Sequence, residues 1–288
     1  MAPRRDILLG LVVIVIWAAN ATTIKFITLE VEPFTGLALR LILASLIFLP
    51  FFRWPGKEKF WLIAQITFLM VVLHWSSLIW SIERLEASMA AILLQTQVIF
   101  AVLLGRFLFK EHFGWYTTGG IALGIAGVVV LVGLPQNPPA LSGVLGMVFS
   151  MLFIALSYAR MKALTDISPI NYMAHMHILA LLPGIALAFA FEKPLETKWQ
   201  NINYAVLLPA LLYQVIIVSV AHMLWQRLMA RNEMSGLPNL TLLLPVLGVL
   251  FAVMLLDEQV TWTMIIGGFL TMAGVSVIML RKHKRLES

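Results

Sequence analysis

Ten apolar segments follow one another along this chain of 288 residues, and they leave few possible folds. We predict helices over residues 6–27, 33–52, 60–81, 87–109, 113–133, 141–161, 169–191, 203–227, 236–256 and 261–280. A helix of about 20 residues crosses a hydrocarbon core of roughly 30 Å, whereas membrane β-strands are about half as long and alternate in polarity. Hydrophobic residues make up 61% of the chain and charged residues 12%, so apolar surface is expected to face lipid. The sequence predicts an all-α polytopic membrane protein.

The second half of the chain resembles the first in two fixed registers. A shift of 147 positions places Glu111 on Glu258, Trp115 on Trp262, Gly120 on Gly267 and Gly127 on Gly274. A shift of 136 positions places Gly10 on Gly146, Ala19 on Ala155 and Pro33 on Pro169. Each half holds five helices, an odd number, so the halves must enter the membrane in opposite senses. We therefore predict two inverted five-helix repeats, 1–135 and 140–285, with a substrate site near the midplane between them.

The basic residues are distributed unevenly over the predicted links. If the N-terminus is cytoplasmic, four basic residues lie on the outer side: Lys25, Arg84, Lys193 and Lys198. Fifteen then lie on the cytoplasmic side: Arg4, Arg5, Arg53, Lys57, Lys59, Arg106, Lys110, Arg160, Lys162, Arg227, Arg231, Arg281, Lys282, Lys284 and Arg285. Cytoplasmic loops carry the excess of Lys and Arg, so both termini are expected in the cytoplasm. The net charge of +6 is explained by this excess of Lys and Arg on the cytoplasmic side, and nucleic acid is not an expected partner.

Glycines recur on the fifth and tenth predicted helices, at Gly120, Gly124 and Gly127 and at Gly267, Gly268 and Gly274. Small residues let helices approach closely in lipid, so helix packing within or between molecules is the main interpretation. Contact with a substrate is the alternative. A monomer and a homodimer both remain open.

These residues resemble the EamA family of the drug/metabolite transporter superfamily. The resemblance covers nearly the whole chain, from Trp17, Asn20, Pro33 and Arg40 through the stretch 94–97 and the Glu111 turn to 242–248 and 255–258. It is closest to the branch that exports amino acids and related metabolites. Membership implies ten helices, two EamA repeats and alternating access. The motifs specify the family far better than they specify the substrate.

Arg40 is the deepest permanent charge in the predicted membrane segments. It lies seven residues into the second helix, about 10 Å from the helix end at 1.5 Å per residue. A charge at the bilayer centre costs roughly 2.5–3.5 kcal/mol on insertion scales, so its presence needs a reason. The guanidinium could bind a substrate carboxylate with two hydrogen bonds, or it could snorkel and cap helix-end carbonyls.

Two pairs of residues on the first and fourth helices are further candidates. Trp17 and Asn20 are three positions apart and share one helix face. Asn20 is expected to make an interhelical hydrogen bond or to line a cavity, since a buried amide needs a partner. Gln95 and Gln97 are two positions apart, about 200° around an α-helix, so they cannot both face one cavity unless the helix is locally irregular. We expect one of them to face the pathway and the other a neighbouring helix. We favour Gln95.

Polar stripes run along the third and eighth helices, which are equivalent in the two repeats. The third carries Thr67, His74 and Ser81 at heptad spacing beside Trp75, and the eighth carries Gln214, His222 and Gln226. These stripes are interpreted either as cavity lining or as buried hydrogen-bonding groups. Of His175 and His177, at most one is expected to line the pathway. The 15 methionines are spread along the chain and are interpreted mainly as packing or lipid-facing residues.

The predicted function is export of small metabolites across the inner membrane, with amino acids or their derivatives as substrates. Export of drugs or toxic compounds is the alternative. The predicted substrate-binding residues are Trp17, Asn20, Arg40, His74, Trp75, Gln95 and His222. Asp and Glu are confined to helix ends and links, so His74 or His222 would titrate if transport is proton-coupled, and facilitated transport needs neither. No enzyme motif, cofactor site or metal site is expected, and the chain has no cysteine.

Overall fold

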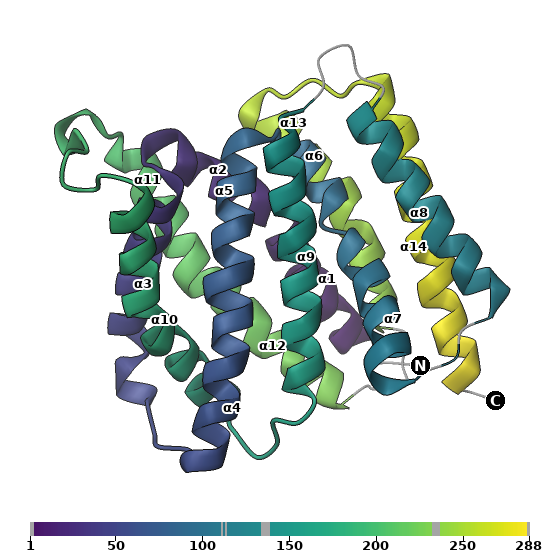
Figure 1. The fold of residues 1–288 in the computed structure, drawn as a ribbon, viewed down its shortest axis with the longest axis horizontal. Coiled ribbons are helices and arrows are strands. Elements are labelled where there is room, and N and C mark those ends of the chain that lie inside the picture. Colours follow the sequence, from purple (N-terminus) through teal and green to yellow (C-terminus); the bar gives the residue numbers. More distant parts are fainter. Residues whose placement is uncertain (1–2, 111, 113, 134–138, 232–236, 287–288) are drawn as a thin grey trace.

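The computed structural model describes residues 3–110, 112, 114–133, 139–231 and 237–286, and they form a bundle of long helices (Figure 1). The first half contains α1 (Arg4–Ala18), α2 (Asn20–Glu30), α3 (Pro33–Phe48), η1 (Leu49–Phe51), α4 (Lys57–Thr67), η2 (Phe68–Trp75), α5 (Ser76–Arg84), α6 (Ala87–Leu93), α7 (Thr96–Phe109) and α8 (Trp115–Gly133). The second contains α9 (Leu141–Met161), α10 (Pro169–Phe191), η3 (Trp199–Asn201), α11 (Tyr204–Leu212), η4 (Tyr213–Ile217), α12 (Val218–Arg231), η5 (Leu237–Leu243), α13 (Leu244–Leu256) and α14 (Trp262–Leu286).

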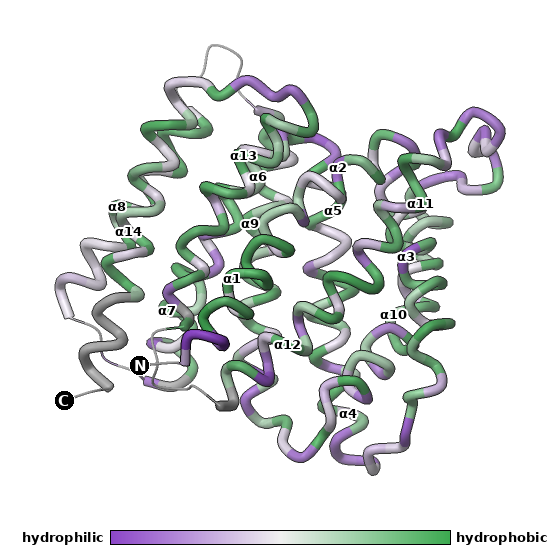
Figure 2. Tube along the Cα trace, turned by 180° about the vertical axis from the view of Figure 1, so that it is seen from behind, coloured by the Kyte–Doolittle hydropathy of each residue, from purple (hydrophilic) through white to green (hydrophobic). Residues whose placement is uncertain are grey.

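Ten candidate membrane spans are present in the described residues, as the sequence predicted. Several consist of two or three elements in line; the third span, for example, joins α4, η2 and α5 over Lys57–Arg84. Its start lies a few residues before the predicted one, because Gly56 (φ +89°) turns the chain into the helix. Figure 2 shows hydrophobic residues along the middle of the helices and hydrophilic residues mostly toward the ends and links. The chain is therefore a multi-pass membrane protein.

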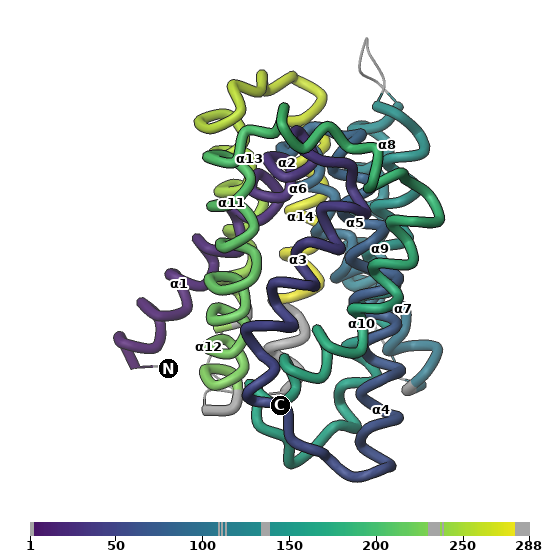
Figure 3. Tube along the Cα trace, turned by 90° about the vertical axis from the view of Figure 1, so that its left-hand side faces the viewer, coloured from purple at the N-terminus to yellow at the C-terminus, as the bar shows by residue number. Residues whose placement is uncertain are grey.

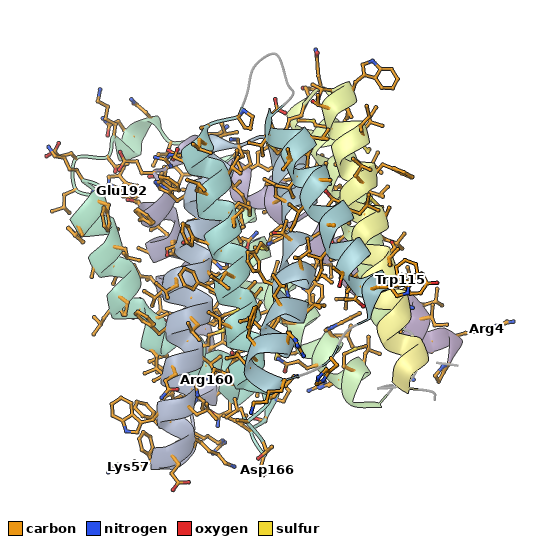
Figure 4. The ribbon with its side chains drawn as sticks, turned by 45° about the vertical axis from the view of Figure 1, so that its right-hand side comes forward. Arg4, Lys57, Trp115, Arg160, Asp166 and Glu192 are labelled. Carbon is orange, nitrogen blue, oxygen red and sulfur yellow. The ribbon has the colours of Figure 1, made fainter. Side chains whose placement is uncertain are left out.

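Both termini lie at the same end of the bundle, which we call the terminal side (Figure 1). Figure 4 shows Lys57 and Arg160 toward this end and Glu192 at the other, which we call the opposite side. Lys57, Arg160 and Glu192 thus lie at the ends where the count of five helices per half places them.

Contacts between the halves pair equivalent spans. The second span packs on the seventh through α3 and α10, the fourth on the ninth through α6 and α13, and the fifth on the tenth through α8 and α14. The contact of α5 with α9 has its counterpart in the contact of α12 with α1. Lys110 and Asp257, which the 147-residue shift aligns, both end their helices in the left-handed conformation, with φ of 53° and 54°. The boundary residues 134–135 and Glu111 lie outside the described residues.

The glycines of α8 and α14 bring these two helices into backbone contact. A Cβ atom added at Gly120 would lie 2.8 Å from the carbonyl oxygen of Gly274, and one at Gly127 would lie 2.6 Å from that of Gly267. Such distances leave no room for any side chain. The stripe is thus a helix-packing surface within this chain, which agrees with the main interpretation of the sequence.

Helical geometry is interrupted in the spans nearest the centre. The third and eighth spans each contain a π-helical stretch, η2 and η4, and the first and fourth spans are broken at Ala19 and at Leu94–Gln95. π-Helical turns and breaks change the direction of side chains, and they are frequent at functional sites. In Figure 3, α1 and α12 form one flank and α4, α5 and α9 the other, with α3 between them.

Candidate substrate cavity

A cavity of about 410 Å³ lies between the two halves. It is lined by the first four spans from one repeat and by the sixth to ninth from the other. All seven residues that we predicted as a site are among the lining residues: Trp17, Asn20, Arg40, His74, Trp75, Gln95 and His222. The structure thus brings together side chains from spans that are far apart in the sequence.

The cavity extends toward the terminal side. Its lining includes Tyr158 and Met161 in the last turns of α9, Tyr172 in the first turn of α10, and Trp225 and Gln226 in α12. All of these lie where the spans approach the terminal side. In the other direction the lining ends near Asn20, Leu78 and Ala91.

Charged groups join the helix ends on the opposite side. The Lys25 Nζ atom donates to the carbonyl oxygens of Ile82, Glu83 and Leu85 at 2.8, 2.9 and 2.8 Å, and so holds the C-terminus of α5. Glu258 accepts from the backbone N–H groups of Ala87 and Ser88 at 2.7 and 2.9 Å, at the N-terminus of α6. Carboxylates at helix N-termini and cations at C-termini also interact favourably with the helix dipole. These contacts tie the fourth span to the link after the ninth, and the third span to the first.

Glu192 makes a similar contact at the start of α3. Its carboxylate accepts from the N–H groups of Phe34 and Thr35, both at 2.7 Å, and from the Thr35 hydroxyl at 2.8 Å. Burial nevertheless raises the pKa of Glu192 above its ordinary value, because desolvation outweighs these hydrogen bonds. Burial and the nearby Glu258 likewise raise the pKa of Glu86, and Lys25 opposes them.

Arg40 lies in the cavity wall without a counter-charge. Its side chain stacks on the ring of Trp75, with the guanidinium carbon 3.8 Å from the ring centroid. The residue is 8% exposed, and its buried Nε atom has no hydrogen-bond partner. Among the described residues no carboxylate forms an ion pair with it. Its head therefore neither caps helix-end carbonyls nor reaches the end of the span.

His74 is oriented by a pair of hydrogen bonds with Ser150 of α9. The Ser150 hydroxyl donates its one hydrogen to the His74 carbonyl oxygen at 3.0 Å. The same hydroxyl oxygen must therefore accept in its 2.7 Å contact with His74 Nδ1. The neutral ring is thereby assigned the Nδ1–H tautomer, which leaves Nε2 as an acceptor. His222 is fixed in the same way, because its Nδ1 lies 2.8 Å from the Val218 carbonyl oxygen, which can only accept. Each repeat thus places one imidazole acceptor in the cavity lining.

Asn20 fulfils both roles that the sequence left open. Its side-chain oxygen accepts from Gln214 Nε2 at 2.8 Å, which links the first and eighth spans, and it also lines the cavity. The neighbouring Trp17 packs against His222 and Trp225, at ring-centroid distances of 4.9 and 5.3 Å. A polar amide and an aromatic pair therefore share this wall.

Gln95 and Gln97 both line the cavity, and the expectation that only one would do so is wrong. It assumed a continuous α-helix. The turn at Leu94–Gln95 separates α6 from α7 and changes the angle between the two side chains. No Gly or Pro marks this break in the sequence.

Other lining residues were not expected from the sequence. Five of the methionines line the cavity, namely Met70, Met151, Met161, Met173 and Met176, although we had interpreted methionine mainly as packing. Tyr158 and Tyr172 were also missed. His175 and His177 are buried outside the lining and stack on Phe52 and Phe48, at centroid distances of 4.2 and 5.2 Å. In the described part of the chain, no three His, Cys, Asp or Glu side chains gather as a metal site would require.

Two halves of five spans around a central polar cavity define the class of polytopic membrane transporters. The EamA-like transporter family matches residues 4–133 and 141–280, and this chain belongs to that family. It is a transporter family and not an enzyme family.

Relatives of the same length include a "Probable amino-acid metabolite efflux pump" of Escherichia coli (strain K12), 27% identical over 99% of this chain and 98% of that protein. A protein of the same description from Salmonella typhimurium is 26% identical over 95% of this chain and 94% of its own length. A solved structure titled "Crystal structure of protein" covers 100% of both chains with a TM-score of 0.66 and 18% identity, which supports the fold alone.

Proposed function

We propose that this protein exports small metabolites, amino acids or their derivatives, from the cytoplasm by alternating access. The observation that carries the proposal is the cavity between the two halves, which gathers polar groups from both and extends toward the terminal side. Relatives described as amino-acid metabolite efflux pumps support the substrate class and the direction. In this mechanism the halves would rock about the cavity so that it faces each side in turn.

The orientation of the chain decides what the present conformation does. The excess of basic residues that the sequence assigns to the terminal side, fifteen against four, supports a cytoplasmic location of that side. We propose that the membrane is the inner membrane. The cavity would then face the cytoplasm, ready to load substrate. A phosphatase that is active only in the periplasm, fused after Ser288, should stay silent. An active fusion would contradict the proposed orientation.

Transport itself is tested by counterflow in proteoliposomes. Vesicles preloaded with an unlabelled amino acid or derivative should accumulate the labelled compound from outside, and empty vesicles or vesicles without the protein should not. The screen should begin with compounds that raise the melting temperature of the purified protein, because a ligand stabilises in proportion to RT ln(1 + [L]/Kd). Failure of every amino acid and derivative that is tried would contradict the proposal.

Export of drugs is the second candidate, and one observation favours it. Three tryptophans, two tyrosines and five methionines line the cavity, a surface that can adapt to varied apolar molecules: Trp17, Trp75, Trp225, Tyr158, Tyr172, Met70, Met151, Met161, Met173 and Met176. Lipophilic drugs should therefore be included in the same counterflow panel. Their transport in preference to amino acids and derivatives would establish this second function.

A further inference from the structure

The described cavity lining has one permanent charge, and it is positive. Asp, Glu and Lys are absent from that lining, and Arg40 is its only permanently charged residue. The remaining polar groups are amides, hydroxyls and the imidazoles of His74 and His222. A carboxylate, the usual counter-charge in a cation site, is thus absent from the described lining, and the Trp75 ring is already in contact with Arg40.

The Arg40 guanidinium lacks the partner that a buried charge requires. It stays protonated under all physiological conditions, and more than nine-tenths of the residue is removed from solvent. Within the described residues the guanidinium makes no hydrogen bond or ion pair, and it stacks on the Trp75 ring. A buried charge without a counter-ion is strongly unfavourable. A carboxylate that enters the cavity would supply this counter-ion and would accept two parallel hydrogen bonds from the guanidinium.

The rest of the lining distinguishes anions from zwitterions. In an α-amino acid the ammonium is on the carbon next to the carboxylate, so a carboxylate bound to Arg40 places two positive charges within a few ångströms. Like charges repel strongly in a low-dielectric site, and no lining carboxylate among the described residues offsets this. The Nε2 atoms of His74 and His222 can accept from an uncharged N–H group, which carries no such penalty.

From these observations we infer that the cavity selects small monocarboxylates of net charge −1, with an apolar or aromatic body and an amino nitrogen that is acylated or absent. Arg40 binds the carboxylate, and the tryptophan and methionine side chains of the lining contact the body. The inference rests on the proposed function and narrows it from amino acids and their derivatives to the anionic derivatives.

Four compounds with a phenyl body and different net charges test the inference on the wild-type protein. They are 3-phenylpropionate and N-acetylphenylalanine (−1), phenylalanine (zwitterion) and phenethylamine (+1). Binding is measured by thermal stabilisation and tryptophan fluorescence, and transport by counterflow in proteoliposomes. Both anions should bind at least about tenfold more tightly than phenylalanine, a difference that corresponds to about 1.4 kcal/mol. Phenethylamine should not bind in the same concentration range.

Variants connect this preference to Arg40. Arg40→Gln should abolish the advantage of the anions over phenylalanine, and Arg40→Lys should retain part of it, since lysine keeps the charge without the planar fork. Arg84→Gln is the matched control, because the Arg84 guanidinium also stacks on a tryptophan, Trp80, at 4.0 Å but does not line the cavity. The order of the four compounds should be unchanged in that control.

The outcomes separate the inference from the proposed function. If phenylalanine binds and is transported as well as N-acetylphenylalanine, the inference is overturned while amino-acid export stands. Tightest binding of phenethylamine overturns the inference and favours drug export. If no compound binds or is transported, the inference fails together with the proposed export of amino acids and their derivatives. The wild-type series decides among these results even if the Arg40 variants do not fold.

Discussion

At the scale of single residues, His74 and Ser150 show how a neighbour outside the cavity lining sets the chemistry of a lining residue. Their two hydrogen bonds fix both the direction of the ring and the nitrogen that carries the proton. Hydrogen-bond partners of this kind preorganise a binding site, because the ring has little freedom to lose when a ligand binds. The equivalent bond of His222 uses its own helix carbonyl.

His74→Ala and Gln95→Ala are each expected to impair export while leaving membrane insertion intact. Each removes one polar group from the cavity wall, and loss of one hydrogen bond of about 1 kcal/mol lowers affinity by about fivefold. Counterflow rates normalised to protein in the vesicles measure the effect. His175→Ala is the control, since His175 is buried outside the lining. Wild-type rates for both lining variants would refute the pathway between the third, fourth and eighth spans.

Sequence reasoning found polar residues of the lining but could not sort the apolar ones. A charged or amide side chain in an apolar segment needs a partner or a cavity, so Arg40, Asn20 and Gln95 stood out. Met151 and Met173 have no such requirement, and a methionine facing lipid looks the same in the sequence as one facing the cavity. Gln97 was misplaced because no Gly or Pro in the sequence signals the break at Leu94–Gln95.

At the scale of helices, the carboxylate caps on the opposite side are the contacts that must change if the cavity is to open there. Glu258 joins the link after α13 to the first turn of α6, and Glu192 joins the end of α10 to the first turn of α3. Helix ends carry unpaired N–H groups, so a cap that is lost must be replaced by water or by another side chain. The caps thus stabilise the conformation that is closed on this side.

Glu258→Ala is expected to favour opening on the opposite side. Loss of an N-cap is worth about 0.5–2 kcal/mol, which corresponds to a shift of about twofold to thirtyfold in the equilibrium if the cap is absent from the open state. The chain lacks native cysteine, so Leu78→Cys provides a single label site at that end of the cavity. A membrane-impermeant maleimide added from that side should react faster in the Glu258→Ala background. Equal rates with and without Glu258 would show that the cap does not control this side.

The raised pKa of Glu192 predicts how the stability of the folded protein depends on pH. Its pKa in the folded protein lies above that of the unfolded chain, so folding favours the protonated form. The stability contribution is present below the unfolded pKa and is lost as pH rises through the folded pKa. Glu192→Gln mimics the protonated carboxyl, so wild-type melting temperature should fall relative to the variant between acid and neutral pH. A difference that stays constant, or changes in the other direction, would contradict the shift.

The contact of α8 with α14 gives a packing prediction with an internal control. Gly127→Ala places a Cβ atom against the α14 backbone, and overpacking of this kind costs about 1–3 kcal/mol. Gly119→Ala on the same helix meets nothing within 4 Å and should be neutral or slightly stabilising. Thermal unfolding of the purified variants measures both. Similar melting temperatures would mean that the helices separate at little cost.

The sequence predicts the helices better than their irregularities. Span lengths and the repeat registers follow from hydrophobic runs and from pairs such as Lys110 and Asp257, which end equivalent helices in the same backbone conformation. The π-helical stretches η2 and η4 have no comparable signal, because neither contains Gly or Pro and most of their residues are apolar, with His74 and Gln214 as polar exceptions.

At the scale of the whole molecule, the two halves meet along equivalent spans and line a cavity between them that extends toward the terminal side. The charged contacts on the opposite side come from links and helix ends, whereas the cavity wall comes from the middle of the spans and from their turns toward the terminal side. In the alternating access that we propose, the side on which the transporter is closed would change without dismantling the site itself. That change would require the cavity to close toward the terminal side in turn.

A bulky group attached at the mouth should therefore stop transport. Gln226 lines the cavity in α12, near the terminal side, and Gln226→Cys would be the only thiol in the chain. Labelling it with a large maleimide should block counterflow, because the label fills the entrance and prevents the halves from closing over it. Leu195→Cys, in the exposed link after α10, is the control: labelling there leaves both the entrance and the moving contacts free. The unlabelled Gln226→Cys protein must first be shown to transport. Full activity after complete labelling at position 226 would mean that substrate does not pass through this mouth, and the cavity would then not be the transport pathway.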